Sequence, residues 1–184
     1  MVDTDQQAVE EIVHQGDALG TRELLDILER YHDDRPGVPE AAVDAYVQEL
    51  EEREDSSFDR EGFVAAVGER RTGSESWVDD GDRIYELGDG RISQYPAAWH
   101  DRLRGERDPA AYLRFFEATA PSVLGNTSGG RQRANEDQLI DVMAVVGGMD
   151  REAAKAEIEA ARDDDRIAED ADQHPKAGVY LAED

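Results

Sequence analysis

The chain has no cysteine, only two lysines, and twelve aromatic residues among its 184. Without cysteine it has no disulfide framework, no thiolate nucleophile and no thiolate metal site. No apolar run approaches the roughly 20 residues of a membrane-spanning helix, and the first residues lack the basic and apolar regions of a signal peptide. We therefore expect a soluble, cytoplasmic protein with no membrane partner, whose 39% of apolar residues form a modest core.

Carboxylates dominate the charge, because 45 acidic residues stand against 20 basic ones and give a net charge of −25. They are interleaved with apolar residues at helical spacing along the whole chain, whereas acidic tails consist of blocks of like charge. With eighteen arginines, two lysines and 24 aspartates, the composition resembles that of proteins from salt-in halophilic archaea. The resemblance implies that most surface carboxylates keep the protein hydrated in a high-salt cytoplasm and do not form a specific site.

The first half of the chain predicts several helices followed by a two-stranded hairpin. Apolar spacing and capping residues predict helices over 5–14, from Thr21 as N-cap to Tyr31, from Pro39 to Leu50, and from Asp59 as N-cap to about Arg71. Phe58 and Phe63 are placed to form a hydrophobic staple.

The hairpin is predicted over 84–95, because Asp89-Gly90 is a strong signal for a tight turn with positive φ at both central residues. In that register Leu87 faces Ile92 and Ile84 faces Tyr95. We predict that residues 1–96 form an N-terminal helical unit that ends in this hairpin.

The second half repeats the order of helices and then a hairpin. Short helices are predicted from Pro96 to Leu103 and, after the Asp108-Pro109 cap, up to Pro121, followed by a polar loop over 125–134. Asn135 and Asp150 are predicted to cap two further helices, and short strands are predicted over 166–169 and 178–182. Residues 97–184 are predicted to form the C-terminal domain.

The segment from Asn135 to Ala182 resembles the end of a winged-helix domain, with a helix, a Gly-containing turn, a longer helix and a β wing. The residues that carry the resemblance are Gly147-Gly148-Met149, Ala154, Ile158, Ala161, Ile167 and Val179-Tyr180-Leu181. The family's first helix falls on 109–119, which puts an eleven-residue loop, 125–135, where a short connection is usual. The predicted fold class is mainly α with small β-hairpins (α+β), in tandem winged-helix-like units, with the stronger resemblance in the C-terminal one.

A tandem of such units in an acidic chain is similar to the kleisin-associated subunits of chromosome-condensation complexes, whose winged helices are implied to bind protein and not DNA. The segment Arg91-Ile92-Ser93-Gln94-Tyr95-Pro96, followed by Trp99, is similar to that family's wing and following helix. The apolar signature at the start of its second domain is absent from 108–123, so only the architecture carries over.

The distribution of charge predicts that any nucleic-acid contact lies outside the second helix of the helix–turn–helix, which is predicted to begin at Asp150. Residues 150–165 contain three basic and seven acidic residues, a net charge of −4, which phosphates would repel. Residues 91–133 contain seven arginines and four acidic residues, a net charge of +3. The predicted nucleic-acid-binding residues come from this stretch and from the wing: Arg102, Arg104, Arg107, Arg131, Arg133 and Lys176. The alternative is that these arginines pair with neighbouring carboxylates.

No catalytic or metal-ligating motif stands out. The four histidines are far apart and lack H-x-x-x-H or H-E-x-x-H spacing, and neither a phosphate loop nor a G-x-S-x-G elbow is present. We predict no catalytic residue, metal or cofactor. The leading hypothesis is a non-enzymatic, DNA-associated or transcription-regulatory protein. The alternatives are a protein-binding adaptor and a small enzyme, and the partner is DNA or a protein, with a homodimer left open.

Overall fold

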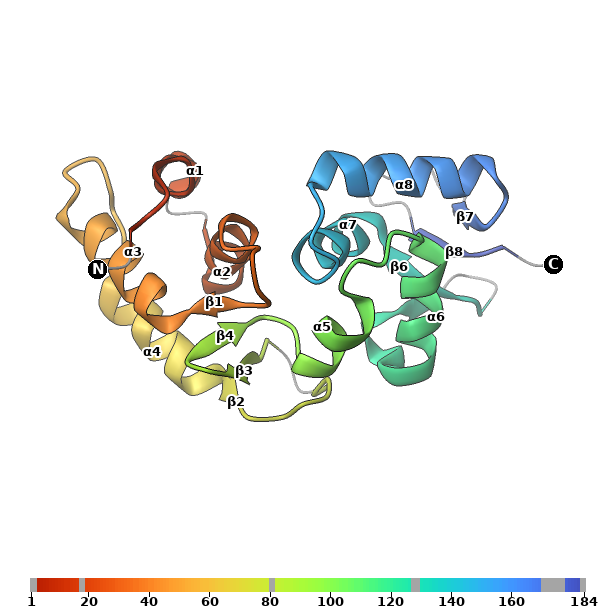
Figure 1. Ribbon diagram of the computed structural model, residues 1–184, viewed down its shortest axis with the longest axis horizontal. Coiled ribbons are helices and arrows are strands. Elements are labelled where there is room, and N and C mark those ends of the chain that lie inside the picture. The colour runs from red at the N-terminus through yellow and green to blue at the C-terminus, as the bar shows by residue number, and fades with distance from the viewer. Residues whose placement is uncertain (1–2, 17–18, 80–81, 127–129, 170–177, 183–184) are drawn as a thin grey trace. The chain divides into compact units, whose positions relative to one another are not determined.

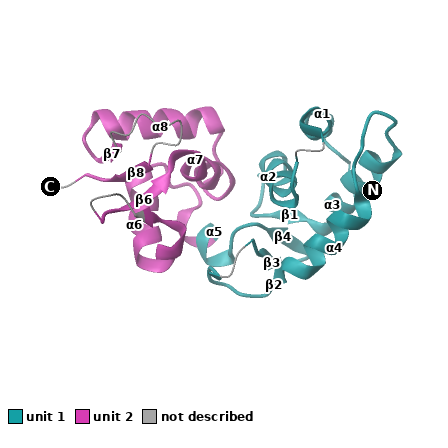
Figure 2. Cartoon of the chain, turned by 180° about the vertical axis from the view of Figure 1, so that it is seen from behind, with its two compact units in different colours: residues 1–100 teal, residues 101–184 magenta. Residues whose placement is uncertain are grey.

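The computed structural model describes residues 3–16, 19–79, 82–126, 130–169 and 178–182. The chain forms two compact units, Met1–His100 and Asp101–Asp184, coloured separately in Figure 2. The boundary between them lies within helix α5, Ala97–Leu103. The prediction of a mainly α protein with small β-hairpins (α+β) is confirmed as to class, and each hairpin belongs to a small four-stranded sheet.

Unit 1 packs helices against a small sheet (Figure 1). Its strands lie in the order β1-β4-β3-β2, with β2 and β3 parallel and the other pairs antiparallel. Its elements before α5 are α1 (Gln6–Gln15), α2 (Thr21–Tyr31), β1 (Val38–Pro39), α3 (Glu40–Glu52), α4 (Arg60–Arg70), β2 (Arg71–Thr72), β3 (Ile84–Gly88) and β4 (Arg91–Ser93).

Local capping chemistry sets the helix starts in unit 1. The carboxylate of Asp59 accepts a hydrogen bond from the Gly62 amide at 3.0 Å, as predicted for the N-cap of α4. The rings of Phe58 and Phe63 lie 5.6 Å apart across this cap, which confirms the staple. The predicted N-cap Thr21 is wrong by one residue, because Gly20 takes the extended cap conformation and Thr21 begins the helix.

The hairpin turn is confirmed, but its predicted register is wrong. Asp89 and Gly90 both have positive φ, 51° and 66°. A bulge between Glu86 and Gly88 takes up one residue, so Glu86, and not Leu87, faces Ile92. The pairs beyond the bulge are therefore displaced by one position from those predicted.

Unit 2 has a second small sheet, in the order β5-β6-β8-β7, with all pairs antiparallel. The capping roles of Asp108 and Asn135 are confirmed, since each carboxyl or amide oxygen accepts from a backbone amide of the following helix. Its elements after α5 are α6 (Pro109–Thr119), the 3-10 helix η2 (Pro121–Val123), β5 (Gly125–Asn126), β6 (Gln132–Asn135), α7 (Glu136–Val145), α8 (Arg151–Asp163), β7 (Ile167–Glu169) and β8 (Gly178–Leu181).

The prediction of a loop over 125–134 is wrong, because this segment contains β5 and most of β6. Strand β6 pairs with β8, with Ala134 opposite Val179, both buried. The apolar contact of Ala134 with the core and the ladder to β8 hold this polar segment extended. The two predicted C-terminal strands are confirmed as β7 and β8.

The same order of elements occurs in both units. A helix, a strand, two helices and two strands follow one another, as α2-β1-α3-α4-β3-β4 in unit 1 and α6-β6-α7-α8-β7-β8 in unit 2. In unit 1, β1 pairs with β4 and β4 pairs with β3. In unit 2, β6 pairs with β8 and β8 pairs with β7 in the same way. Unit 1 adds α1 and β2 to this order, and unit 2 adds η2 and β5.

Candidate functional site

Three of the candidate arginines lie where α5 leads into α6. Arg102 is exposed on α5, and Arg104 and Arg107 are exposed in the turn after it. The Gly105 amide of this turn donates to the carbonyl oxygen of Gly147 at 3.0 Å. Arg104 and Arg107 are therefore held next to the turn between α7 and α8.

Arg131 and Arg133 lie at a different place in unit 2, along the β6–β8 pair. The guanidinium carbon of exposed Arg131 is 5.4 Å from the ring centroid of Tyr180, a cation–π distance. The side chain of Arg133 packs so closely on Gly178 that a Cβ atom there would overlap with it. Lys176, the remaining candidate, lies outside the described residues.

The arginines around α8 are engaged by carboxylates. Arg107 Nη2 lies 2.6 Å from Glu157 Oε1 on α8. Arg162 of α8 pairs with Glu136 at 2.9 Å, and Arg151 at the start of α8 pairs with Asp141 on α7. Much of the positive charge near this helix is therefore neutralised within the unit.

The exposed face of α8 is acidic. It presents Glu152, Lys155, Ala156, Glu159, Ala160 and Asp163, three carboxylates and one amine. Counted over the whole sequence, unit 2 has eleven basic and nineteen acidic residues, a net charge of −8, and unit 1 has nine and twenty-six, a net charge of −17.

Arg91, which begins the electropositive stretch in the sequence, is a structural residue of unit 1. It is only 9% exposed, and its guanidinium donates to the carbonyl oxygens of Pro36 at 2.8 Å, Arg35 at 2.9 Å and Gly37 at 2.6 Å. It fixes the 35–37 loop onto β4, so its charge is used inside the fold.

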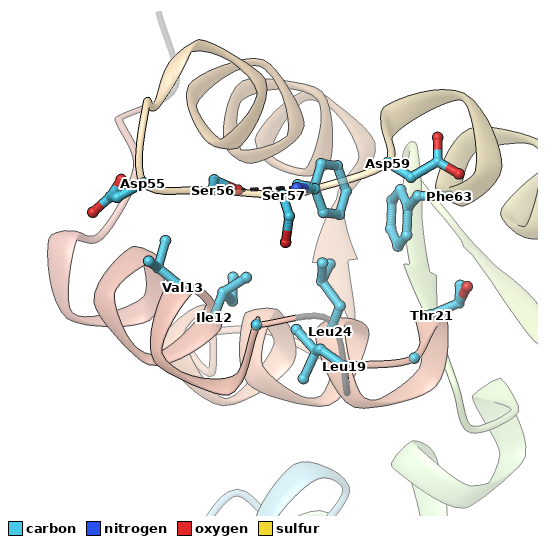
Figure 3. Close-up of a pocket in the computed structure, with 13 residues that line it drawn as sticks. Ile12, Val13, Leu19, Thr21, Leu24, Asp55, Ser56, Ser57, Asp59 and Phe63 are labelled. Carbon is cyan, nitrogen blue, oxygen red and sulfur yellow. Dashed lines mark hydrogen bonds between the residues drawn. The ribbon is translucent and has the colours of Figure 1, made fainter.

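A pocket of about 290 Å³ opens between α1, α2 and the 55–59 loop of unit 1 (Figure 3). The side chains of Ile12, Val13 and Leu24 point toward the loop, which contributes Ser56 and Ser57 on the other side. The Ser56 hydroxyl accepts a hydrogen bond from the Phe58 amide at 3.2 Å, so it serves the loop conformation. Phe63 lines this pocket and also a second cavity, between α3 and α4.

A polar network is buried where α2, β4 and α5 meet in unit 1. Glu29 accepts hydrogen bonds from the Ser93 hydroxyl at 2.7 Å and the Gln94 amide at 2.8 Å. Ser93 Oγ also lies 2.9 Å from His100 Nε2. Burial raises the pKa of Glu29 to about 8, and nearby Asp26 adds to the shift, while the hydrogen bonds and Arg22 oppose it. Glu29, Ser93 and His100 are all at most 4% exposed, so the network positions α5 and is not an open site.

Sequence reasoning missed the exposed side of α4 and the buried carboxyl of α2, although signals for both were present. Val64, Ala65 and Gly68 form an uncharged helical face in a chain with 35% charged residues. Glu29 follows Leu25 by four residues and so lies on the apolar stripe of its helix.

Comparison of the chain with protein-family models, curated proteins and solved structures finds no match. Within the described residues, no group of three or more histidine, aspartate or glutamate side chains is placed to hold a metal ion. No helix in the described part of the chain is both long and apolar enough to cross a membrane.

Proposed function

We propose that the chain is a non-enzymatic adaptor that binds another protein through two winged-helix-like units. The repeated order of elements supports the winged-helix assignment, since each unit has a strand between its first two helices, a helix–turn–helix and a final hairpin. In this assignment α4 and α8 are the helices that DNA-binding members of the fold insert into the major groove.

The charged side chains on and around α8 favour a protein over DNA as the partner. A helix that enters a groove needs basic side chains that reach phosphates and bases. Here Glu157 on α8 holds Arg107 in an ion pair, and the exposed face has three carboxylates and one amine. The acid-rich surface supports a protein that works in a high-salt cytoplasm, where the Debye length is about 3 Å at 1 M salt and this repulsion is weaker.

The adaptor function is tested by recovering a defined partner in molar KCl. The tagged full chain is used to isolate proteins from cells that contain it, and each recovered protein is then purified and titrated back onto the chain. A stoichiometric complex of the two purified proteins is the expected result. A chain that remains monomeric and forms no complex with any recovered protein contradicts the proposal.

A second candidate is the DNA-associated or transcription-regulatory function, which the exposed side chains of Arg102, Arg104 and Arg131 favour. This function predicts that duplex DNA binds the chain and that Arg131→Ala together with Arg133→Ala weakens the binding. DNA binding that these substitutions leave unchanged would exclude that surface, and no DNA binding would exclude the function.

A further inference from the structure

A groove of about 240 Å³ lies between α3 and α4 in unit 1. Its apolar walls are formed by Val43 and Val47 from α3 and by Phe63, Val64 and Val67 from α4. Val64 is 53% exposed, and no other large apolar side chain among the described residues is as exposed. The groove thus presents apolar surface to solvent in a unit whose net charge is −17.

Ion pairs hold the groove at both ends. Arg60 at the start of α4 lies 2.7 Å from Glu51 near the end of α3. At the other end, Arg71 lies 2.9 Å from Glu40 at the start of α3. The two helices are therefore joined on either side of the apolar walls, and the arginines that border the groove are already paired.

One exposed carboxylate lies on the α3 side of the groove. Asp44 is exposed on α3 and lines the groove between the two ion pairs. The whole unit carries a net charge of −17. A ligand that covers the groove therefore gains if it brings positive charge next to its apolar side chains.

Small residues on α4 permit a close approach. Ala65 and Gly68 are exposed one turn apart, beside Val64. A Cβ atom built at Gly68 would have no other atom within 4 Å. The backbone of a ligand can thus come near to α4 without a clash.

We propose that the α3–α4 groove binds an amphipathic helix of a partner protein, with its apolar side chains against Val64 and Val67 and its basic side chains beside Asp44. The proposal rests on the adaptor function and names its site and the class of its partner. An apolar cavity of about 150 Å³ holds a benzene ring, so the groove has room for one or two large apolar side chains. An apolar helix face in such a groove is a common mode of peptide recognition. A second copy of this chain is a poor occupant, because it brings a further net charge of −25.

The test uses a labelled synthetic peptide of about 18 residues, five helical turns, with leucine along one face and lysine elsewhere. Its binding to the full chain is followed by fluorescence anisotropy in about 1 M KCl, where long-range attraction is screened. Val64→Glu is expected to weaken binding at least tenfold, because it removes an apolar contact and places a carboxylate among the leucines. General attraction between lysine and an acidic protein predicts the opposite, since the variant adds negative charge.

Three comparisons keep this test specific. Ala156→Glu adds the same charge at an exposed position of α8 and is expected to leave peptide binding unweakened. Asp44→Lys is expected to weaken binding several-fold, and a peptide with glutamate in place of lysine is expected not to bind. Because Val64 and Asp44 are exposed, circular dichroism of both variants is expected to match that of the unsubstituted chain.

Binding that Val64→Glu leaves unchanged would overturn the groove assignment, as would equal binding of a lysine peptide that lacks the leucine face. Self-association of the chain that Val64→Glu abolishes would identify a second copy as the occupant and also overturn the proposal. If a purified partner protein still binds the Val64→Glu chain, the adaptor function stands and the groove assignment alone fails. If no partner protein binds at all, the adaptor function itself fails.

Discussion

Glu29 is a buried carboxyl group in unit 1, and its replacement by glutamine is expected to make the stability of that unit less dependent on pH. The carboxylate accepts two hydrogen bonds, from Ser93 and Gln94, and is only 4% exposed. Glutamine has nearly the same shape. Its oxygen can accept from the Gln94 amide, and its NH2 group can donate to Ser93 Oγ, so the substitution removes the charge and keeps the contacts.

The sign of the effect follows from the raised pKa. Burial holds the pKa of Glu29 at about 8 in the folded protein, against 4.5 for an ordinary glutamate. The folded state therefore binds more protons than the unfolded state between these values, and its stability falls as pH rises. The slope is at most about 1.4 kcal/mol per pH unit, so the contribution of this group to the free energy of unfolding falls by about 2.5 kcal/mol between pH 5 and 7.

Urea unfolding followed by tryptophan fluorescence measures this change in unit 1 alone. Both tryptophans of the chain, Trp77 and Trp99, lie in unit 1, with ring centroids 5.0 Å apart. The free energy of unfolding of the original chain, minus that of Glu29→Gln, is expected to become more negative from pH 5 to pH 8. Because the difference cancels the titration of the other groups, including His32, a constant difference over this range would refute the assignment of a raised pKa to Glu29.

Three further predictions concern stability. Arg91→Met is expected to lower the free energy of unfolding by about 2 kcal/mol or more, because the loop carbonyls of 35–37 lose their donor; a change below that of a surface substitution in a denaturant titration would contradict it. Gly68→Ala is expected to raise the free energy of unfolding by about 0.5–1 kcal/mol, and with it the thermal midpoint, because alanine favours the helix more than glycine does and the new Cβ meets open space. A lower thermal midpoint would show that the new Cβ clashes with a neighbour. Raising KCl from about 0.1 M to 1 M is expected to raise the thermal midpoint of the chain, because it screens the repulsion among carboxylates; a midpoint independent of KCl argues against adaptation to high salt.

Those parts of the fold that depend on neighbouring residues could be predicted from the sequence. Asp59, Asp108 and Asn135 cap their helices because each side chain needs only the amides two or three residues further on. Asp89-Gly90 forms the hairpin turn because both residues tolerate positive φ. These features are local, and the sequence alone specifies them.

Features that depend on distant residues were missed. Strand β6, Gln132-Arg133-Ala134-Asn135, contains no β-branched or aromatic residue, and its pairing with β8 holds it extended. The hairpin register depends on a bulge at Leu87 that no turn signal encodes. Glu29 meets Ser93 across 64 residues, so only the tertiary structure brings them together.

For the candidate arginines, too, the sequence predicts their number but not their contacts with distant residues. Their excess between Arg91 and Arg133 is visible in the sequence, but their surroundings are not. Arg91 is enclosed by loop carbonyls in unit 1, and Arg107 is held by Glu157 across 50 residues. The α3–α4 groove was not predicted. A single apolar stripe on α4 would place its apolar side chains on one side, but Phe63 and Val67 face the core while Val64 faces outward.

The most direct test of the choice between a protein and DNA as the partner presents both classes of ligand to one sample. The leucine–lysine peptide is bound to the full chain in about 1 M KCl, and duplex DNA is then added while the anisotropy of the peptide and that of labelled DNA are followed. If the chain is an adaptor, the peptide stays bound, Val64→Glu releases it, and the DNA remains free. DNA that binds the chain and is released by Arg131→Ala with Arg133→Ala, while the peptide fails to bind, would instead show that the chain binds DNA and not a protein helix.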